Sequence, residues 1–163
     1  MHESKHQIEV ALAPVIKAHD YRKRRLTWYK SCPGTILIFH CEKNRWGANS
    51  YSFFTGICLN CVEQERIPLY YQCPILADLD KLVPNKFELR QFGDFDYQLS
   101  IAAIERISLL VELISVYALP WLESHSTLSQ LSELAQADYE LLLPKVRIFR
   151  HTYDYLRQLQ ERT

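Results

Sequence analysis

Hydrophobic residues recur along the chain with two different spacings, which predict a helix, then strands, then further helices. Over residues 5–19 they recur three or four positions apart, so one helical face carries Ile8, Leu12, Val15, Ile16 and His19. Pro14 lies inside this stretch and should kink the helix or mark its boundary, because proline lacks the backbone N–H that a helix needs.

The pattern then changes to the alternation that is typical of strands, first over 26–31. Cys32-Pro33-Gly34 is a turn sequence, and residues 35–41 are rich in β-branched and aromatic side chains. Strand character returns over 51–62. The connections are too short for crossover helices, so these segments should form an antiparallel meander. Residues 87–92 predict a fourth strand.

The second half of the chain predicts three helices. The longest covers 97–118 and ends before Pro120; its core stripe should comprise Ile101, Ile104, Ile107, Val111 and Ile114. Shorter helices are predicted over 128–137 and 145–161.

These elements predict an α+β fold, with an antiparallel sheet of about four strands and the N-terminal and C-terminal helices packed on one face. We expect the core face of the sheet to carry Trp28, Ile36, Ile38, Phe53 and Ile57. A register shift of one residue would present the alternate set instead.

Composition narrows the class of protein. A length of 163 residues predicts one domain over 1–163. The chain has 19 basic and 19 acidic residues, which excludes a globally basic nucleic-acid binder. The N-terminus lacks the apolar core of a secretory signal, and three charges interrupt the longest apolar stretch, so we expect no membrane span. Five cysteines, an odd number, favour free thiols in a reducing cytoplasm.

The cysteines and histidines suggest two kinds of site chemistry. Cys58 and Cys61 form a C-x-x-C pair that His40 and Cys41 could complete as a zinc site. Residues three apart in a strand face opposite sides, so we expect Cys58 and Cys61 to bind no metal. We also expect no cofactor. A cysteine paired with a histidine could act as a nucleophile, but no local signature supports one.

Charge is unevenly distributed along the chain. Residues 17–30 hold six basic residues and one acidic residue, including the run at 22–25, which precedes Trp28 and Tyr29. Basic and aromatic residues in this order can bind nucleic acid, although the net charge of zero favours a solvated connection. Residues 97–143 hold six acidic residues and one basic residue.

Two segments are candidates for partner binding. Lys43, Arg45 and Trp46 lie in a polar loop between strands, and arginine beside tryptophan is typical of interaction hot spots. Glu105 and Glu112 lie on the long acidic helix, which could attract a basic partner and speed association.

The order of several motifs resembles a bacterial protein family. The motifs are His19 to Arg24, Thr27-Trp28-Tyr29, Ile36 to Trp46, Phe53 to Ile57 and Leu119 to Glu123. They are similar to blocks of the family called domain of unknown function 4304. The resemblance covers about residues 5–125 and leaves 126–163 as a helical C-terminal extension. Tyr21 and Asp20 stand where that family has phenylalanine and glycine.

That family has no established activity, so the resemblance assigns no catalytic residue. Some related small bacterial domains are suspected immunity proteins of toxin systems, which is an association only. We therefore expect a cytoplasmic bacterial protein that binds a protein partner without catalysis, of the immunity or antitoxin type. The alternatives are an enzyme with an unrecognised Cys/His site and nucleic-acid binding through 22–30.

Overall fold

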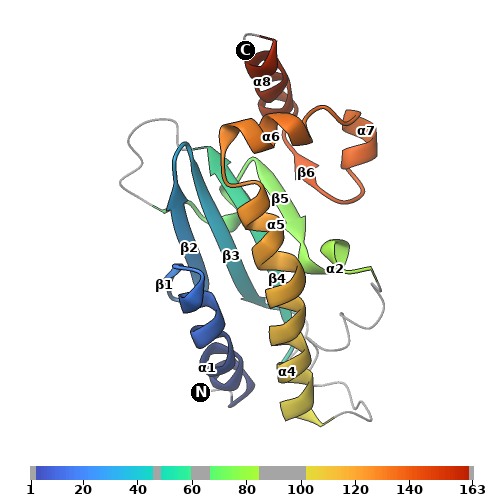
Figure 1. The fold of residues 1–163 in the computed structure, drawn as a ribbon. Helices are drawn as coiled ribbons and strands as arrows, with labels where there is room; N and C mark the ends of the chain where they lie inside the picture. The colour runs from blue at the N-terminus through green and yellow to red at the C-terminus, as the bar shows by residue number, and fades with distance from the viewer. Residues whose placement is uncertain (1–2, 46–48, 60–66, 85–101, 162–163) are drawn as a thin grey trace.

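The fold is seen in a computed structural model, which describes residues 3–45, 49–59, 67–84 and 102–161. It is an α+β fold built on an antiparallel sheet, as the sequence predicts (Figure 1). The sheet has six strands, not about four, and each strand pairs with the next along the chain. The strands are β1 (Arg22–Arg24), β2 (Thr27–Cys32), β3 (Thr35–Lys43), β4 (Tyr51–Leu59), β5 (Ile75–Asp78) and β6 (Arg147–Ile148).

Three of these strands carry little sequence signal. β1 consists of three exposed basic residues at the edge of the sheet, so no hydrophobic alternation identifies it. β5 has four residues and β6 has two. β5 and β6 pair with each other although they are far apart along the chain, and short strands of this kind depend on tertiary pairing. The strand predicted at 87–92 lies outside the described residues.

Helices cover one face of the sheet and one end of it (Figure 1). Those over the face are α1 (Glu3–Ala18), α4 (Ala103–Leu113), the π-helical η2 (Ile114–Ala118) and α5 (Leu119–Ser124). Those at the end are α6 (Leu128–Leu134), α7 (Tyr139–Leu142) and α8 (Arg150–Gln160). The short helices α2 (Leu79–Leu82) and η1 (Tyr70–Gln72) lie between strands along the chain.

The expected end of the long helix before Pro120 is wrong. The backbone continues without a break from α4 through η2 into α5, and Pro120 lies in the first turn of α5. Proline lacks an N–H and normally clashes with the carbonyl four residues earlier. The π segment that precedes it widens the hydrogen-bond spacing, so the helix passes this position.

The sequence predicts the residues of the core face of the sheet only in part. Trp28, Phe53 and Ile57 do belong to the main core beneath the helices. Ile36 and Ile38 lie on the opposite face, with Cys58, Cys73 and Leu76. Five successive residues of β3 are buried, so alternation along that strand could not show which set faces the helices.

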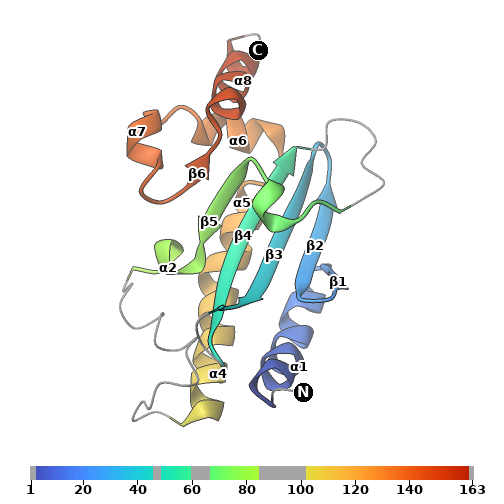
Figure 2. The same ribbon diagram turned by 180° about the vertical axis from the view of Figure 1, so that it is seen from behind.

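The second face of the sheet is covered by residues 67–73, which include η1 (Figure 2). Tyr70 of η1 lies between the rings of His40 and Phe54, with centroids 4.4 and 4.8 Å away. Its hydroxyl donates to Glu42 Oε2 at 2.5 Å. These contacts hold η1 against the middle of β3 and β4.

Candidate functional site

The long helix has a buried inner face and an exposed outer face. Its inner residues are Ile107, Leu110, Ile114, Ala118 and Leu122, which are at most 6% exposed. On the outer face Ile104 is 75% exposed and Val116 is 53% exposed, so the expectation that Ile104 belongs to the core stripe is wrong. The expectation for Ile107 and Ile114 is confirmed, Val111 packs against the core, and Ile101 lies outside the described residues.

Glu105 and Glu112 are exposed on the same helix as these two apolar residues. Glu105, Glu112 and Val116 are separated by seven and four positions, so they lie on one side of the helix, and Ile104 precedes Glu105 in the first turn. We call Ile104, Glu105, Glu112 and Val116 the outer helical surface. It combines exposed apolar side chains with carboxylates, as an interface with a basic partner requires.

The charge around the outer helical surface is acidic. Over residues 102–143 the other exposed acidic residues are Glu133, Asp138 and Glu140. Arg106, the one basic residue over 102–143, is buried. The exposed charged residues of the long helix, Glu105 and Glu112, are therefore both negative, which favours the approach of cations and basic proteins.

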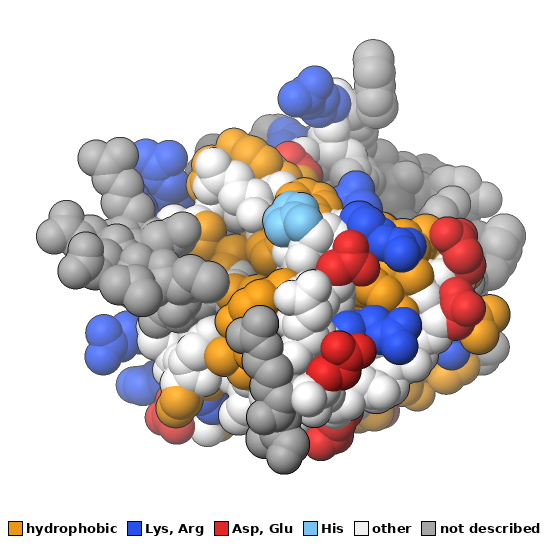
Figure 3. Space-filling model, turned by 90° about the horizontal axis from the view of Figure 1, so that it is seen from above, with side chains coloured by type: hydrophobic (Ala, Val, Ile, Leu, Met, Phe, Trp, Pro, Cys, Tyr) orange, Lys and Arg blue, Asp and Glu red, His pale blue; other side chains and the backbone are white. Residues whose placement is uncertain are grey.

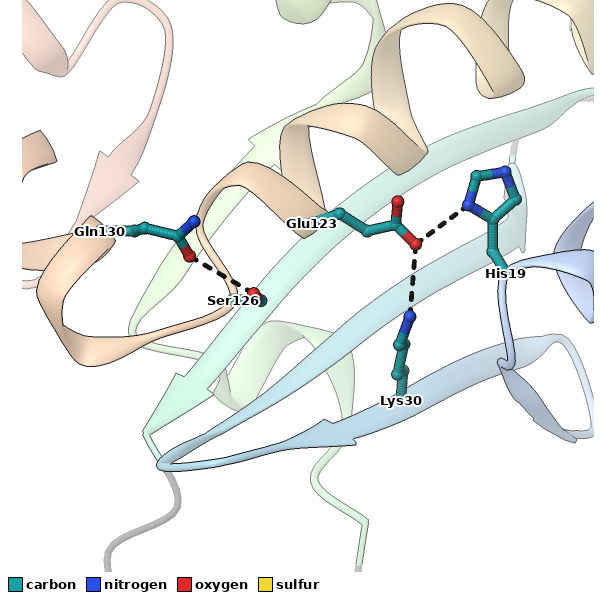
Figure 4. A network of polar contacts seen from close by, with 5 residues as sticks. All are labelled: His19, Lys30, Glu123, Ser126 and Gln130. Carbon is teal, nitrogen blue, oxygen red and sulfur yellow. Dashed lines mark hydrogen bonds and ion pairs between the residues drawn. The ribbon is translucent and has the colours of Figure 1, made fainter.

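The C-terminal end of the long helix is fastened to the sheet by a polar network (Figure 4). Glu123 Oε1 accepts a hydrogen bond from His19 Nδ1 at 2.9 Å and lies 3.4 Å from Lys30 Nζ. The three side chains come from α5, the residue after α1, and β2, and each is about one third exposed. The network therefore joins three elements at one carboxylate.

The turn after α5 continues this attachment. The Thr35 hydroxyl donates to the carbonyl of Ser126, which ties the start of β3 to the turn. The Ser126 hydroxyl donates to Gln130 Oε1 at 3.3 Å (Figure 4). Thr127 then caps α6, because its hydroxyl accepts from the Gln130 backbone N–H at 3.3 Å. The long helix is thus held at its end by side chains from the sheet and from α6.

The hairpin candidates Lys43 and Arg45 are exposed, as expected for binding residues. Trp46 lies outside the described residues. Asn44 fixes the hairpin through two hydrogen bonds to Ser50. Its backbone N–H donates to the Ser50 carbonyl at 2.8 Å, and its side-chain nitrogen donates to the Ser50 hydroxyl at 2.7 Å. The structure therefore places Glu105 and Glu112 on one helix and Lys43 and Arg45 on a hairpin between two strands.

A groove runs across the molecule and has two chemically different ends. Its basic end is lined by Lys5, Glu9, Lys23, Arg24 and Arg25, and its apolar end includes Ile67, Leu69, Phe149 and Tyr155. Figure 3 looks onto the end that α6 and α8 form and shows hydrophobic side chains around a hollow. Glu9 contacts both lysines of the basic end, at 3.9 and 2.9 Å, which leaves the two arginines to face solvent.

Three of the four described cysteines have raised pKa values. Burial raises the pKa of Cys41 to about 12 and also raises the pKa of Cys32. The hydrogen bond to Cys58, followed by burial, raises the pKa of Cys73. A thiol attacks as its thiolate, so these three groups react slowly near neutral pH. Burial lowers the pKa of His40, which faces Thr27 Oγ1 at 2.8 Å. Among the described residues no three His, Cys, Asp or Glu side chains converge as metal ligands.

The long helix is also apolar in composition. Among the described residues one helix, Ile104–Ser124, is long and apolar enough to cross a membrane, with a mean hydropathy of 1.4. Core helices of soluble proteins pass the same test, so this property is weak evidence for a membrane span.

The two glutamates of the outer helical surface stay a prediction as binding residues. The helical period of the sequence assigns Ile104 and, in a widened stripe, Val116 to the core, but both are exposed. The relation to the family called domain of unknown function 4304 stays a prediction. Comparison of the chain with protein-family models, with curated proteins and with solved structures finds no match.

Proposed function

We propose that this protein is a non-catalytic binding module that docks a basic protein through the outer helical surface. The observation that carries the proposal is the pairing of two largely exposed apolar residues, Ile104 and Val116, with Glu105 and Glu112 on one helix. Exposing aliphatic side chains to water costs free energy, and interfaces commonly cover such side chains.

The surrounding charge supports a basic partner in particular. The exposed charged residues of the long helix, Glu105 and Glu112, are both acidic, and its basic residue Arg106 is buried. Complementary charge raises the association rate of two proteins and excludes partners of the wrong sign. An immunity or antitoxin protein, which neutralises a basic toxin by covering it, is a function of this kind.

Rigidity of the surface is a second requirement that the structure meets. The helix is packed by buried residues along its inner side and held at its end by Glu123. A surface that is already ordered loses little conformational entropy on binding. The partner therefore meets a preformed helix.

The test is capture from an extract of the native cells with purified, immobilised protein. The wild type, the Glu105→Lys/Glu112→Lys variant and a Glu133→Lys/Glu140→Lys control are compared by quantitative mass spectrometry. We expect one basic protein to be retained by the wild type and the control and to fall at least tenfold on the first variant. Equal recovery on all three, or no retained protein, would contradict the proposal.

A second candidate function is nucleic-acid binding at the basic end of the groove. The observation that favours it is the exposure of Arg22, Lys23, Arg24 and Arg25 at the edge of the sheet. Glu9 neutralises part of this charge through its contacts with Lys5 and Lys23, which places the candidate second. Fluorescence anisotropy of labelled single-stranded RNA and duplex DNA tests it, with Arg24→Glu/Arg25→Glu as the variant. Micromolar affinity that falls with added salt and is lost in the variant would support this function.

A further inference from the structure

Two cysteines that are distant in the sequence meet on the second face of the sheet. Cys58 Sγ, from β4, lies 2.6 Å from Cys73 Sγ, in the residue that follows η1. Cys58 is 5% exposed and Cys73 is fully buried. A disulfide bond measures about 2.05 Å, so a shift of roughly 0.5 Å brings these atoms to bonding distance.

The backbone around Cys73 is arranged to place its side chain beside Cys58. Gly56 lies two positions before Cys58 on the same face of β4, and a Cβ there would lie 3.0 Å from Cys73 Sγ and 3.2 Å from its Cβ. The glycine therefore provides the space that Cys73 fills. The backbone N–H of Cys73 also donates to the carbonyl of Tyr70 at 3.1 Å.

Other described thiols are excluded as partners by their place in the fold. Cys41 belongs to the main core on the opposite face of the sheet, and Cys32 packs against that same core. The pairing also departs from the C-x-x-C motif, in which Cys58 would pair with Cys61. The fold brings Cys73 to Cys58 by the course of the chain, not by a short sequence spacing.

We propose that Cys58 and Cys73 form a reversible disulfide that fastens η1 to β4. The oxidant is a low-molecular-weight disulfide such as oxidised glutathione. Cys58, as its thiolate, attacks a glutathione sulfur and releases a glutathione thiolate. The second thiolate then attacks the protein sulfur of this mixed disulfide and releases the second glutathione. The two protein thiols lose two protons and two electrons, and oxidised glutathione becomes two reduced molecules.

The disulfide would strengthen the attachment of η1 to the second face of the sheet. Tyr70 holds η1 in place through its stacking on His40 and Phe54 and its hydrogen bond to Glu42. A covalent link at Cys73 adds a second attachment three residues away. Oxidation should therefore slow the local opening of η1 and leave the outer helical surface unchanged, since that surface lies on a helix over the other face.

The test is equilibration of the purified full chain in glutathione buffers from fully reduced to fully oxidised. The samples are then acid-quenched, alkylated and measured by intact mass. We expect two of the five cysteines to become unavailable together, and a cross-link between the tryptic peptide with Cys58 and the one with Cys73. The cross-link should persist in Cys61→Ser and disappear in Cys58→Ser and in Cys73→Ser. Hydrogen exchange of the 70–73 amides should slow at least tenfold on oxidation.

The overturning results are specific. A bond between Cys58 and Cys61, a glutathione adduct without an internal bond, or five alkylated cysteines in the most oxidising buffer each contradict the proposal. Unchanged exchange at 70–73 in cross-linked protein contradicts its role in fastening η1. Loss of folding in a serine variant does not affect the test, because the wild type and Cys61→Ser report the bond by themselves.

Discussion

Single side chains carry the attachment of the long helix to the rest of the molecule. Glu123 is the clearest example, because one oxygen receives His19 and lies near Lys30 (Figure 4). Lys30 Nζ also lies 5.8 Å from the ring centroid of Tyr21. Burial, followed by the charges of Glu123 and Cys32, raises the pKa of the Tyr21 hydroxyl. Loss of the Glu123 carboxylate should therefore change the surroundings of His19, Lys30 and Tyr21.

Replacement of Glu123 with alanine should lower the free energy of unfolding by about 1 kcal/mol, since two partly exposed polar contacts are lost. Urea denaturation followed by circular dichroism measures the change. Glu133→Ala, on the exposed side of α6, is the matched control and should stay within about 0.5 kcal/mol of the wild type. Equal losses in both variants would show that the network does not stabilise the fold.

His40 should make stability depend on pH. Burial lowers its pKa below the ordinary 6.5, with Glu42 acting in the opposite direction. As pH falls through 6.5 the unfolded chain takes up the proton first, so the contribution of His40 is complete above 6.5 and is lost below it. Between about pH 7 and 5, the stability of the wild type should fall more steeply than that of His40→Phe, which keeps a ring against Tyr70. Parallel curves would contradict this role.

The helices and strands that could be predicted from sequence are those with a strong hydrophobic periodicity. α1, β2, β3, β4 and the long helix have strong periodicity and are found close to their predicted positions. β1 and β6 have no such periodicity and form only because a partner strand is already present. The contacts between His19 and Glu123, and between Cys58 and Cys73, join residues 104 and 15 positions apart, which local patterns cannot reveal.

The start of α6 offers a test at this scale. Thr127 and Gln130 form a capping box, in which each side chain binds the backbone N–H of the other residue. Thr127→Ala should destabilise the protein by about 1 kcal/mol because the first turn of α6 loses a partner. Thermal unfolding of this variant is compared with Ser129→Ala, an exposed position in the same helix. A drop in Ser129→Ala as large as that in Thr127→Ala would argue against the cap.

The whole molecule is neutral in net charge but divided in its surface charge. Exposed basic residues gather at the β1 edge and recur over 145–157, whereas the exposed charges of the long helix are carboxylates. The sequence predicts this division, because the charges are already separated along the chain. It does not predict which residues share a surface with the acids, because the exposure of Ile104 and Val116 depends on how the helix is rotated against the sheet.

The sharpest check on the outer helical surface is the rate at which the captured partner associates with this protein at increasing salt. Stopped-flow measurements compare the wild type with Glu105→Lys/Glu112→Lys between roughly 20 and 500 mM salt, because screening over this range reduces charge steering. We predict a wild-type rate that falls by at least tenfold across the range and a variant rate that is low throughout. Rates that are equal for the two proteins and independent of salt would contradict the proposed binding surface.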